Sequence, residues 1–309
     1  MTTDATFSYD EFGMLHENAS EMGLTLTSQN VRRETVVVDF ATGQRVSALV
    51  WGEASPQDVE LVLIHGGAQN AHTWDSVAIA LGCPLVAIDM PGHGHSDHRH
   101  DHAYWPDENA RAIEVALRSL CPAPRLVVGM SLGGLTSIAL SAIAPDLVRS
   151  LLLVDVTPGV DSEKAKTIHQ FIDGPQYFDS FEQILERTVM FNPTRSERSL
   201  RRGIMHNAAP DADGRWRWRY DLPRRGTGAG ADGSVLPGLA NLWQAIGAST
   251  MPLTLARGAK SPVVSEEDVS ELLRLRPNAG VHIFDDAGHS IQGDSPVELS
   301  RLITEMLAR

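Results

Sequence analysis

The sequence predicts an α/β protein built on a mostly parallel, eight-stranded sheet with helices on both faces and a helical cap inserted into the chain. Six near-continuous apolar runs of strand length end in Gly, Pro, Asp or Ser: VELVLIHGG, PLVAIDMPG, PRLVVGMS, SLLLVDVTPG, PLTLARG and GVHIFDDAGH. Runs that are apolar on both faces are typical of parallel strands covered by helices on both sides. A long stretch between the fourth and fifth runs lacks this rhythm, which predicts the inserted cap.

Residues 1–31 are predicted to form an N-terminal helical extension. Apolar side chains recur there at helical spacing, at Phe12, Leu15, Ala19 and Met22. Gly23 follows in the position where a helix commonly ends. We expect a short amphipathic helix that packs on the rest of the protein and has no catalytic role.

The remainder divides into a core, residues 32–157 and 250–309, and a cap, residues 158–249. The core begins with ETVVVDF and RVSALVW, two strand-like segments separated by Ala41-Thr42-Gly43, as in a hairpin. The cap contains helical stretches such as SFEQILERTVMF and no convincing strand, and its Gly-rich residues 226–233 are interpreted as a loop. Near the end of the chain, Ser295-Pro296-Val297-Glu298 predicts a capping box for the last helix.

Composition and charge exclude several classes of protein. The 309 residues are 42% hydrophobic and 21% charged, which excludes a disordered, collagenous or coiled-coil chain. The net charge of −13 makes nucleic acid or an anionic membrane an unexpected partner. Cys83 and Cys121 lack metal-ligand spacing, and no signal peptide or membrane-spanning run is visible. These observations favour a cytoplasmic location.

The clearest motif for chemistry is Gly129-Met130-Ser131-Leu132-Gly133, between a strand-like run and a helical segment. A nucleophile on such a tight turn is exposed at the sheet edge, and small residues two positions away let neighbouring backbone approach. The helix that follows Ser131 places N–H groups where an oxyanion develops. We therefore predict that Ser131 is a nucleophile.

A serine hydroxyl needs a base, and His289 is the best-placed histidine because it follows the last strand-like run, at a carboxyl edge. A second informative turn, His65-Gly66-Gly67-Ala68, follows the third predicted strand. The N–H of Gly67, or of its neighbour Ala68, is expected to join the N–H of Leu132 in an oxyanion hole. His65 itself is expected to bind loop backbone.

Together with Asp89-Met90-Pro91-Gly92-His93-Gly94-His95-Ser96, these ordered motifs resemble the α/β-hydrolase fold superfamily over residues 32–157 and 250–309. The resemblance implies a Ser-acid-His triad in that chain order and a cap inserted after the sixth strand. It is specific for the fold and much less so for the substrate.

The acid of the triad departs from the pattern common in this superfamily, where it follows the seventh strand. Here that strand is followed by Ala259-Lys260-Ser261-Pro262, without a carboxylate. Asp155 ends the sixth strand, and this resembles relatives such as haloalkane dehalogenases, in which the acid stands there. We predict that Asp155 orients His289. The acids at the start of the following predicted helix are the alternatives: Glu266, Glu267 and Asp268.

Two further patterns are interpreted as structural. One is a polar loop with alternating histidines, namely His93, His95, His98, His100 and His102. This pattern indicates a solvated segment. No second cluster of ligands accompanies it, so no metal site is expected. Nine arginines between residues 195 and 225 make the cap locally basic. We expect them to stack on Trp216, Trp218 and Tyr220 or to pair with acidic core surface, although an anionic substrate stays open.

The predicted function is hydrolysis of a carboxylic ester, or a related acyl bond, of a small molecule through an acyl-enzyme on Ser131, with no cofactor. The same triad also serves C–C bond, amide and thioester hydrolysis and acyl transfer. The alternative hypothesis, from another functional class, is a ligand receptor that has this fold but does not turn over its ligand. Because many reactions share one scaffold, the fold cannot choose among them.

Overall fold

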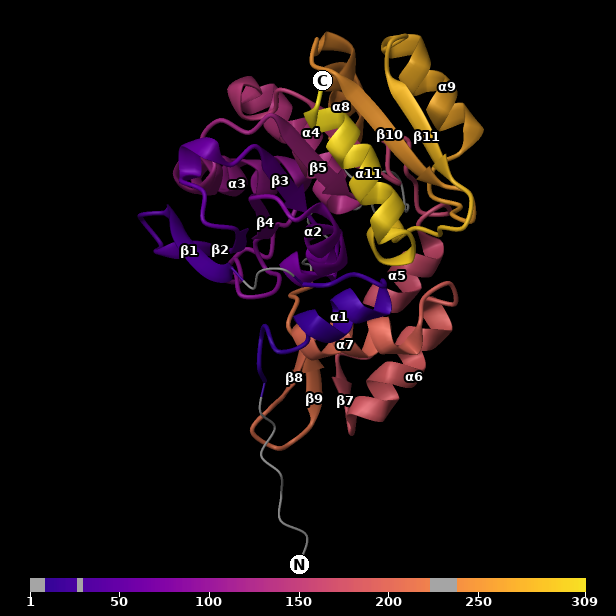
Figure 1. The fold of residues 1–309 in the computed structure, drawn as a ribbon. Helices are drawn as coiled ribbons and strands as arrows, with labels where there is room; N and C mark the ends of the chain where they lie inside the picture. The colour runs from indigo at the N-terminus through magenta and orange to yellow at the C-terminus, as the bar shows by residue number, and fades with distance from the viewer. Residues whose placement is uncertain (1–8, 27–29, 223–237) are drawn as a thin grey trace, which may run out of the picture.

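The computed structural model describes residues 9–26, 30–222 and 238–309, and its centre is an eight-stranded sheet (Figure 1). The strand order is β1-β2-β4-β3-β5-β6-β10-β11. β2 pairs antiparallel with β1 and β4, and every other neighbouring pair is parallel. The predicted mostly parallel sheet is confirmed. Its strands are β1 (Val31–Asp39), β2 (Gln44–Trp51), β3 (Leu61–Ile64), β4 (Leu85–Asp89), β5 (Leu126–Met130), β6 (Leu151–Val154), β10 (Leu253–Gly258) and β11 (Gly280–Phe284).

Helices cover both faces of this sheet, as two buried apolar clusters show. One face packs against α3 (Pro106–Leu120), α4 (Leu132–Ile143), α8 (Leu239–Ala248) and α9 (Glu266–Leu275). The other packs against α1 (Leu15–Glu21), α2 (Asp75–Leu81), α10 (Ile291–Asp294) and α11 (Pro296–Leu307). Successive residues of one strand enter opposite clusters, such as Val127 and Val128 of β5, which explains why the central strands are apolar throughout. The described residues also form three short 3-10 helices: η1 (Pro56–Asp58), η2 (Ala71–Trp74) and η3 (Pro145–Leu147).

Helix α1 lies where the apolar spacing predicts a short N-terminal helix. Helix α1 ends at Glu21, and Gly23 follows with φ +68°, the left-handed conformation that its predicted position requires. Leu15 and Ala19 are buried, and α1 contacts α2. The hairpin of β1 and β2 turns at Gly43, which has φ +74°.

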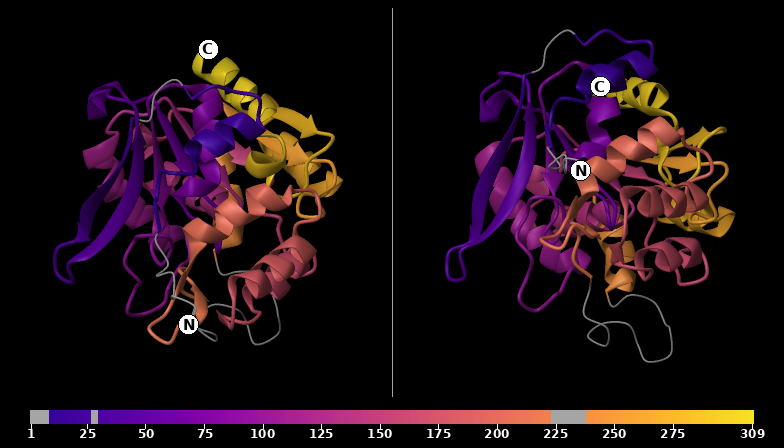
Figure 2. Two further views of the ribbon diagram at one scale, coloured as in Figure 1. Left: turned by 60° about the horizontal axis from the view of Figure 1, so that its bottom comes forward. Right: turned by 90° about the horizontal axis from the view of Figure 1, so that it is seen from below.

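The segment between β6 and β10 contains helices and also a small sheet. Besides α8, its helices are α5 (Lys166–Ile172), α6 (Phe181–Phe191) and α7 (Glu197–Asn207), and Figures 1 and 2 show these three gathered on one side of the main sheet. The expectation of no strand there is wrong, because three short antiparallel strands form a sheet in the order β7-β9-β8. These strands are β7 (Tyr177–Phe178), β8 (Ala208–Pro210) and β9 (Trp216–Trp218), too short for an alternating pattern to stand out in the sequence.

The predicted cap range, residues 158–249, also includes α8. Leu242 and Ile246 of this helix lie in the main buried cluster, and α8 contacts α4 and α9. A separate apolar cluster, which includes Ile184 and Leu200, joins α6 and α7. The Gly-rich residues 226–233 lie outside the described residues.

The starts of α9 and α11 differ in whether a side chain caps the helix. Ser265 and Asp268 form a complete capping box at α9. The box predicted at Ser295 is wrong: Ser295 makes no side-chain cap, and its N–H is donated to the carbonyl of Ile291 in the preceding α10. Within the described residues, no helix is both long and apolar enough to cross a membrane.

Candidate active site

Ser131 lies on the tight turn that joins β5 to α4. Its backbone has φ +51° and ψ −121°, an unfavourable conformation for a residue with a side chain. A Cβ atom on Gly129 would lie 2.5 Å from the carbonyl oxygen of Gly133, and one on Gly133 would lie 2.3 Å from the carbonyl oxygen of His65. Only glycine fits at both positions, which is the close backbone approach that the motif predicts.

Asp155 and His289 are brought together from the ends of two parallel strands. Asp155 directly follows β6 and is fully buried, with φ +50°. Its Oδ2 atom lies 2.8 Å from Nδ1 of His289, in the loop after β11. Its Oδ1 atom accepts a hydrogen bond from the N–H of Gly258 at 2.9 Å. The carboxylate therefore engages Nδ1 of His289, and Nε2 is the ring atom left for a proton transfer of the predicted kind.

The three alternative acids lie at the start of α9 and have other partners. Glu266 pairs with Arg257, and its side chain is 77% exposed. Asp268 is bound by Lys164 and by the capping box of α9. Glu267 is exposed at the helix start. Of the predicted acids, the structure places Asp155 against His289.

Ser261 is a site residue that the sequence analysis did not assign. Its hydroxyl donates to Oδ2 of Asp155 at 2.5 Å, and its own Oγ accepts from the N–H of Val263. Ser261 lies in the loop after β10. In many members of the α/β-hydrolase superfamily, which the sequence resembles, the acid of the triad follows this strand. A polar side chain in this loop, which lacks a carboxylate, was the feature of the sequence that could have identified Ser261.

The loop after β3 presents backbone donors beside Ser131. The N–H of Ala68 is donated to Nε2 of His93 at 3.1 Å, so it is already engaged. The N–H groups of Gly67 and Leu132 have no hydrogen-bond partner among the described residues. These two groups are free to bind an oxyanion, whereas Ala68, the alternative donor, is held by His93.

His65 supports this loop from inside. Its Nδ1 lies 2.7 Å from the carbonyl oxygen of Gly66, and its Nε2 accepts from the N–H of Met90 at 3.0 Å. This pattern identifies the neutral tautomer with the proton on Nδ1. Burial lowers the pKa of His65 to about 3. The expectation that His65 binds loop backbone is confirmed.

A cavity of about 260 Å³ lies over these groups. Ser131 and His289 line it together with Gly67, so the predicted nucleophile, base and one N–H donor border one space. Its other walls include apolar side chains of the segment between β6 and β10, namely Ile168, Phe171, Ile172 and Phe191. Lys164 and Lys260 also line it, and each is paired with a carboxylate, of Asp268 and Asp286 respectively.

The arginine-rich stretch follows the structural interpretation, with partly different partners. Arg202 pairs with Glu17 and Glu21 of α1. Three others lie over aromatic rings, with Arg201 on Phe181, Arg215 on Tyr177 and Arg219 on Tyr9, rather than on the predicted rings. Arg224 and Arg225 lie outside the described residues.

The family comparison agrees with the fold. The family model described as the alpha/beta hydrolase fold matches residues 60–296. The chain belongs to the α/β-hydrolase fold family.

Two relatives place the chain within this family. Esterase Rv0045c of Mycobacterium tuberculosis (strain H37Rv) is 40% identical over 314 residues, which cover 99% of each chain. The 2-(acetamidomethylene)succinate hydrolase of Mesorhizobium japonicum is 25% identical, covering 80% of this chain and 87% of its own length.

Solved structures of the M. tuberculosis esterase have the same fold. One, described with that enzyme's inhibition by transition metals, has a TM-score of 0.84 and covers 98% of this chain and 100% of its own. Another, described as a novel esterase, has a TM-score of 0.81 and covers 98% of this chain and 99% of its own. Both are 40% identical to this α/β-hydrolase.

Proposed function

We propose that this α/β-hydrolase cleaves carboxylic esters of small molecules, with Ser131 as nucleophile, His289 as general base and acid, and Asp155 as the group that orients His289. The observation that supports it most is the 2.8 Å contact between Asp155 Oδ2 and His289 Nδ1, beside a cavity that Ser131 and His289 both line. The 40% identity with an esterase over the whole chain supports the ester as the bond cleaved.

In the first half-reaction, Oγ of Ser131 bonds to the ester carbonyl carbon while its proton moves to Nε2 of His289. The N–H groups of Gly67 and Leu132 bind the resulting oxyanion. Collapse of the tetrahedral intermediate breaks the bond to the alcohol oxygen, which takes the proton from His289. An alcohol leaves, and an acyl-enzyme remains on Ser131.

In the second half-reaction, His289 takes a proton from water, and the hydroxide oxygen bonds to the acyl carbon. Collapse breaks the bond to Oγ of Ser131, which recovers its proton from His289. A carboxylic acid leaves, and the enzyme returns to its starting state. Every proton in the cycle passes through His289, and no cofactor enters it.

The cavity favours a short, neutral acyl group. Its volume of about 260 Å³ is small for a ligand site, and its walls from α5 and α6 are apolar except at Thr167. The ammonium groups of Lys164 and Lys260 are each compensated by a carboxylate, so they give little net attraction to an anion. We therefore expect short-chain esters to be preferred over carboxylated ones.

The test is turnover of a series of p-nitrophenyl esters by the full chain and by Ser131→Ala. We expect turnover that falls as the acyl chain lengthens, and loss of nearly all of it in Ser131→Ala. The same panel extended to amides and thioesters compares the other acyl bonds. Stoichiometric binding of esters without release of p-nitrophenol would favour a receptor instead.

A further inference from the structure

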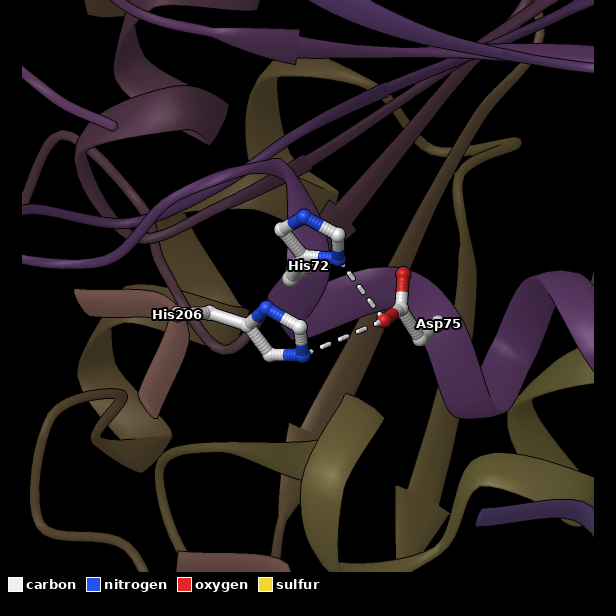
Figure 3. A group of neighbouring side chains, drawn as sticks. All are labelled: His72, Asp75 and His206. Carbon is white, nitrogen blue, oxygen red and sulfur yellow. Dashed lines mark hydrogen bonds and ion pairs between the residues drawn. The ribbon is translucent and has the colours of Figure 1, made fainter. Parts of the chain in front are cut away.

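A second cluster of ionisable side chains lies where η2 and α2 meet α7, and none of its members lines the cavity of Ser131. It consists of His72 in η2, Asp75 at the start of α2, and His206 near the end of α7 (Figure 3). All three are buried, with 8%, 3% and 5% of their surface exposed. They line a cavity of about 130 Å³ that adjoins the cavity of Ser131. The two cavities share the lining residues Ala68, Gln69, Phe171, Asn192 and Ser290.

The potential ligand atoms converge on one carboxylate. Oδ2 of Asp75 lies 2.9 Å from Nδ1 of His72 and 3.9 Å from Nε2 of His206. The two imidazole rings are stacked, with centroids 3.7 Å apart and planes 9° from parallel, so both nitrogens face Asp75 (Figure 3). All three ligand atoms lie within 4.8 Å of one another. Ligand atoms bound to one zinc ion at about 2.0–2.1 Å lie roughly 3.3 Å apart. Because an imidazole binds zinc close to its own ring plane, binding also requires one of the two rings to tilt out of the parallel stack.

The far nitrogen of each imidazole already has a partner. Nε2 of His72 lies 3.1 Å from Oε1 of Glu11, and Nδ1 of His206 lies 2.7 Å from the hydroxyl of Tyr9. Histidines that bind metals commonly donate their second N–H to a carboxylate or another oxygen, which fixes the ring and its tautomer. Glu11 and Tyr9 supply that arrangement here, so a proton on each far nitrogen leaves the lone pairs nearest Asp75 for a ligand. The guanidinium of Arg33 lies 3.4 Å from Nε2 of His72, farther than Glu11, and it is paired with Glu11 and Asp89.

Asp75 provides an independent indication of a missing partner. Its Oδ1 atom is buried and makes no hydrogen bond to any described residue. Burying a carboxylate oxygen without a donor is costly, and a bound cation removes that cost. Two imidazoles and one carboxylate are ligands that suit zinc and similar transition metals better than calcium or magnesium.

We propose that His72, Asp75 and His206 bind one divalent transition-metal ion, such as Zn²⁺, which holds α7 against η2 and α2. Glu11 and Tyr9 are the outer partners, so the ion also secures the N-terminal segment. The neighbouring cavity leaves room for a water or small anion as a fourth ligand. The role of this site is structural, because none of its three ligands lines the cavity of Ser131.

The competing explanation is an ion pair without metal. Burial alone would lower the pKa of His72, but the carboxylates of Asp75 and Glu11 outweigh it and raise the pKa to about 9. A proton on His72 would then hold the cluster together, with His206 neutral. The two explanations differ in what the purified protein binds, so a metal titration separates them.

The experiment uses the full chain without a histidine tag, stripped with a chelator and titrated with Co²⁺ and Zn²⁺. We expect one equivalent of each to bind, with visible Co²⁺ absorption typical of nitrogen and oxygen ligands and a Zn²⁺-dependent rise in Tm. Loss of one outer partner in Glu11→Gln should weaken binding by about 10–100-fold, and His206→Asn should weaken it at least as much. His169→Ala, an exposed histidine of α5, is the matched control and should bind normally.

Asn replaces His206 with another polar side chain, so the fold is expected to be retained. The Tm of His206→Asn without metal shows whether the variant folds. A normal metal-free Tm with no Zn²⁺ response would support the site. Absence of saturable one-equivalent binding to the wild type would overturn the proposal. Unchanged binding in His206→Asn would overturn it equally.

Discussion

The hydroxyl of Ser261 donates a hydrogen bond of 2.5 Å to Oδ2 of Asp155, the same carboxylate oxygen that faces His289. Asp155 thereby receives three donors, from Ser261, His289 and the N–H of Gly258. These contacts tie the loop after β10 to the acid after β6. The loop that lacks an acid thus still contributes to holding His289 in place.

Removing that hydroxyl should slow catalysis without weakening substrate binding. A hydrogen bond to a charged group contributes about 1.5–3 kcal/mol, so we expect Ser261→Ala to lower kcat by roughly tenfold or more with KM nearly unchanged. The pH profile of kcat/KM should also shift, since one donor to the carboxylate is lost. The control is Ser270→Ala, an exposed serine of α9. An unaltered kcat and pH profile in Ser261→Ala would show that the bond is only structural.

Replacing the acid separates the competing assignments. We expect Asp155→Asn to lower kcat by about 10⁴-fold, because the amide no longer selects the correct imidazole tautomer. Glu267→Gln should leave kcat within about twofold of wild type, since Glu267 is exposed at the start of α9. Steady-state kinetics on one p-nitrophenyl ester measures both. The opposite ranking of the two variants would move the acid to α9.

Acid should destabilise the protein through His65. Its folded pKa of about 3 lies below the unfolded value of about 6.5, so the unfolded state takes up the proton first as the pH falls. The contribution of His65 is therefore retained above pH ~6.5 and lost progressively between there and about 3, by up to ~1.4 kcal/mol per pH unit.

Urea unfolding at about pH 7.5 and about pH 5 measures this loss. His65→Gln can keep both backbone hydrogen bonds but does not titrate, so its stability should fall by ~2 kcal/mol less than that of the wild type over this interval. Equal losses in the two proteins would contradict the assignment of a neutral, buried His65.

The turn at Ser131 should not accept a side chain at Gly133. A Cβ atom there would lie within 2.4 Å of backbone oxygens of both Ile64 and His65, so Gly133→Ala should destabilise the fold by about 1–3 kcal/mol and impair activity. Gly203→Ala is the matched control within α7, where no atom lies within 4 Å of the added Cβ. That change should stabilise the protein by about 0.5–1 kcal/mol. Thermal unfolding of both variants measures the contrast, and equal shifts would contradict the close packing at the turn.

The sheet was predictable because its signals are local. Strands that are buried on both faces must be apolar throughout, and Ser131 is marked by glycines on either side. The pairing of Asp155 with His289 was a prediction from the strand ends and the resemblance, and the structure places the two in contact.

Other features depend on contacts between distant segments. The cluster of His72, Asp75 and His206 joins η2 and α2 to α7, so no spacing in the sequence reveals it. The histidines between His93 and His102, which are close together in the sequence, contribute no ligand to that cluster. The strands β7 to β9 are two or three residues long, below the length at which periodicity can be recognised.

The most direct test of the central claim is covalent labelling with a fluorophosphonate, followed by mass spectrometry of the intact chain and of its peptides. The reagent reports a serine whose hydroxyl is activated beside an oxyanion hole. We predict one adduct per chain, on the peptide that contains Ser131, with labelling strongly slowed in His289→Ala. Labelling at another serine, or none by the folded chain, would contradict the proposed nucleophile.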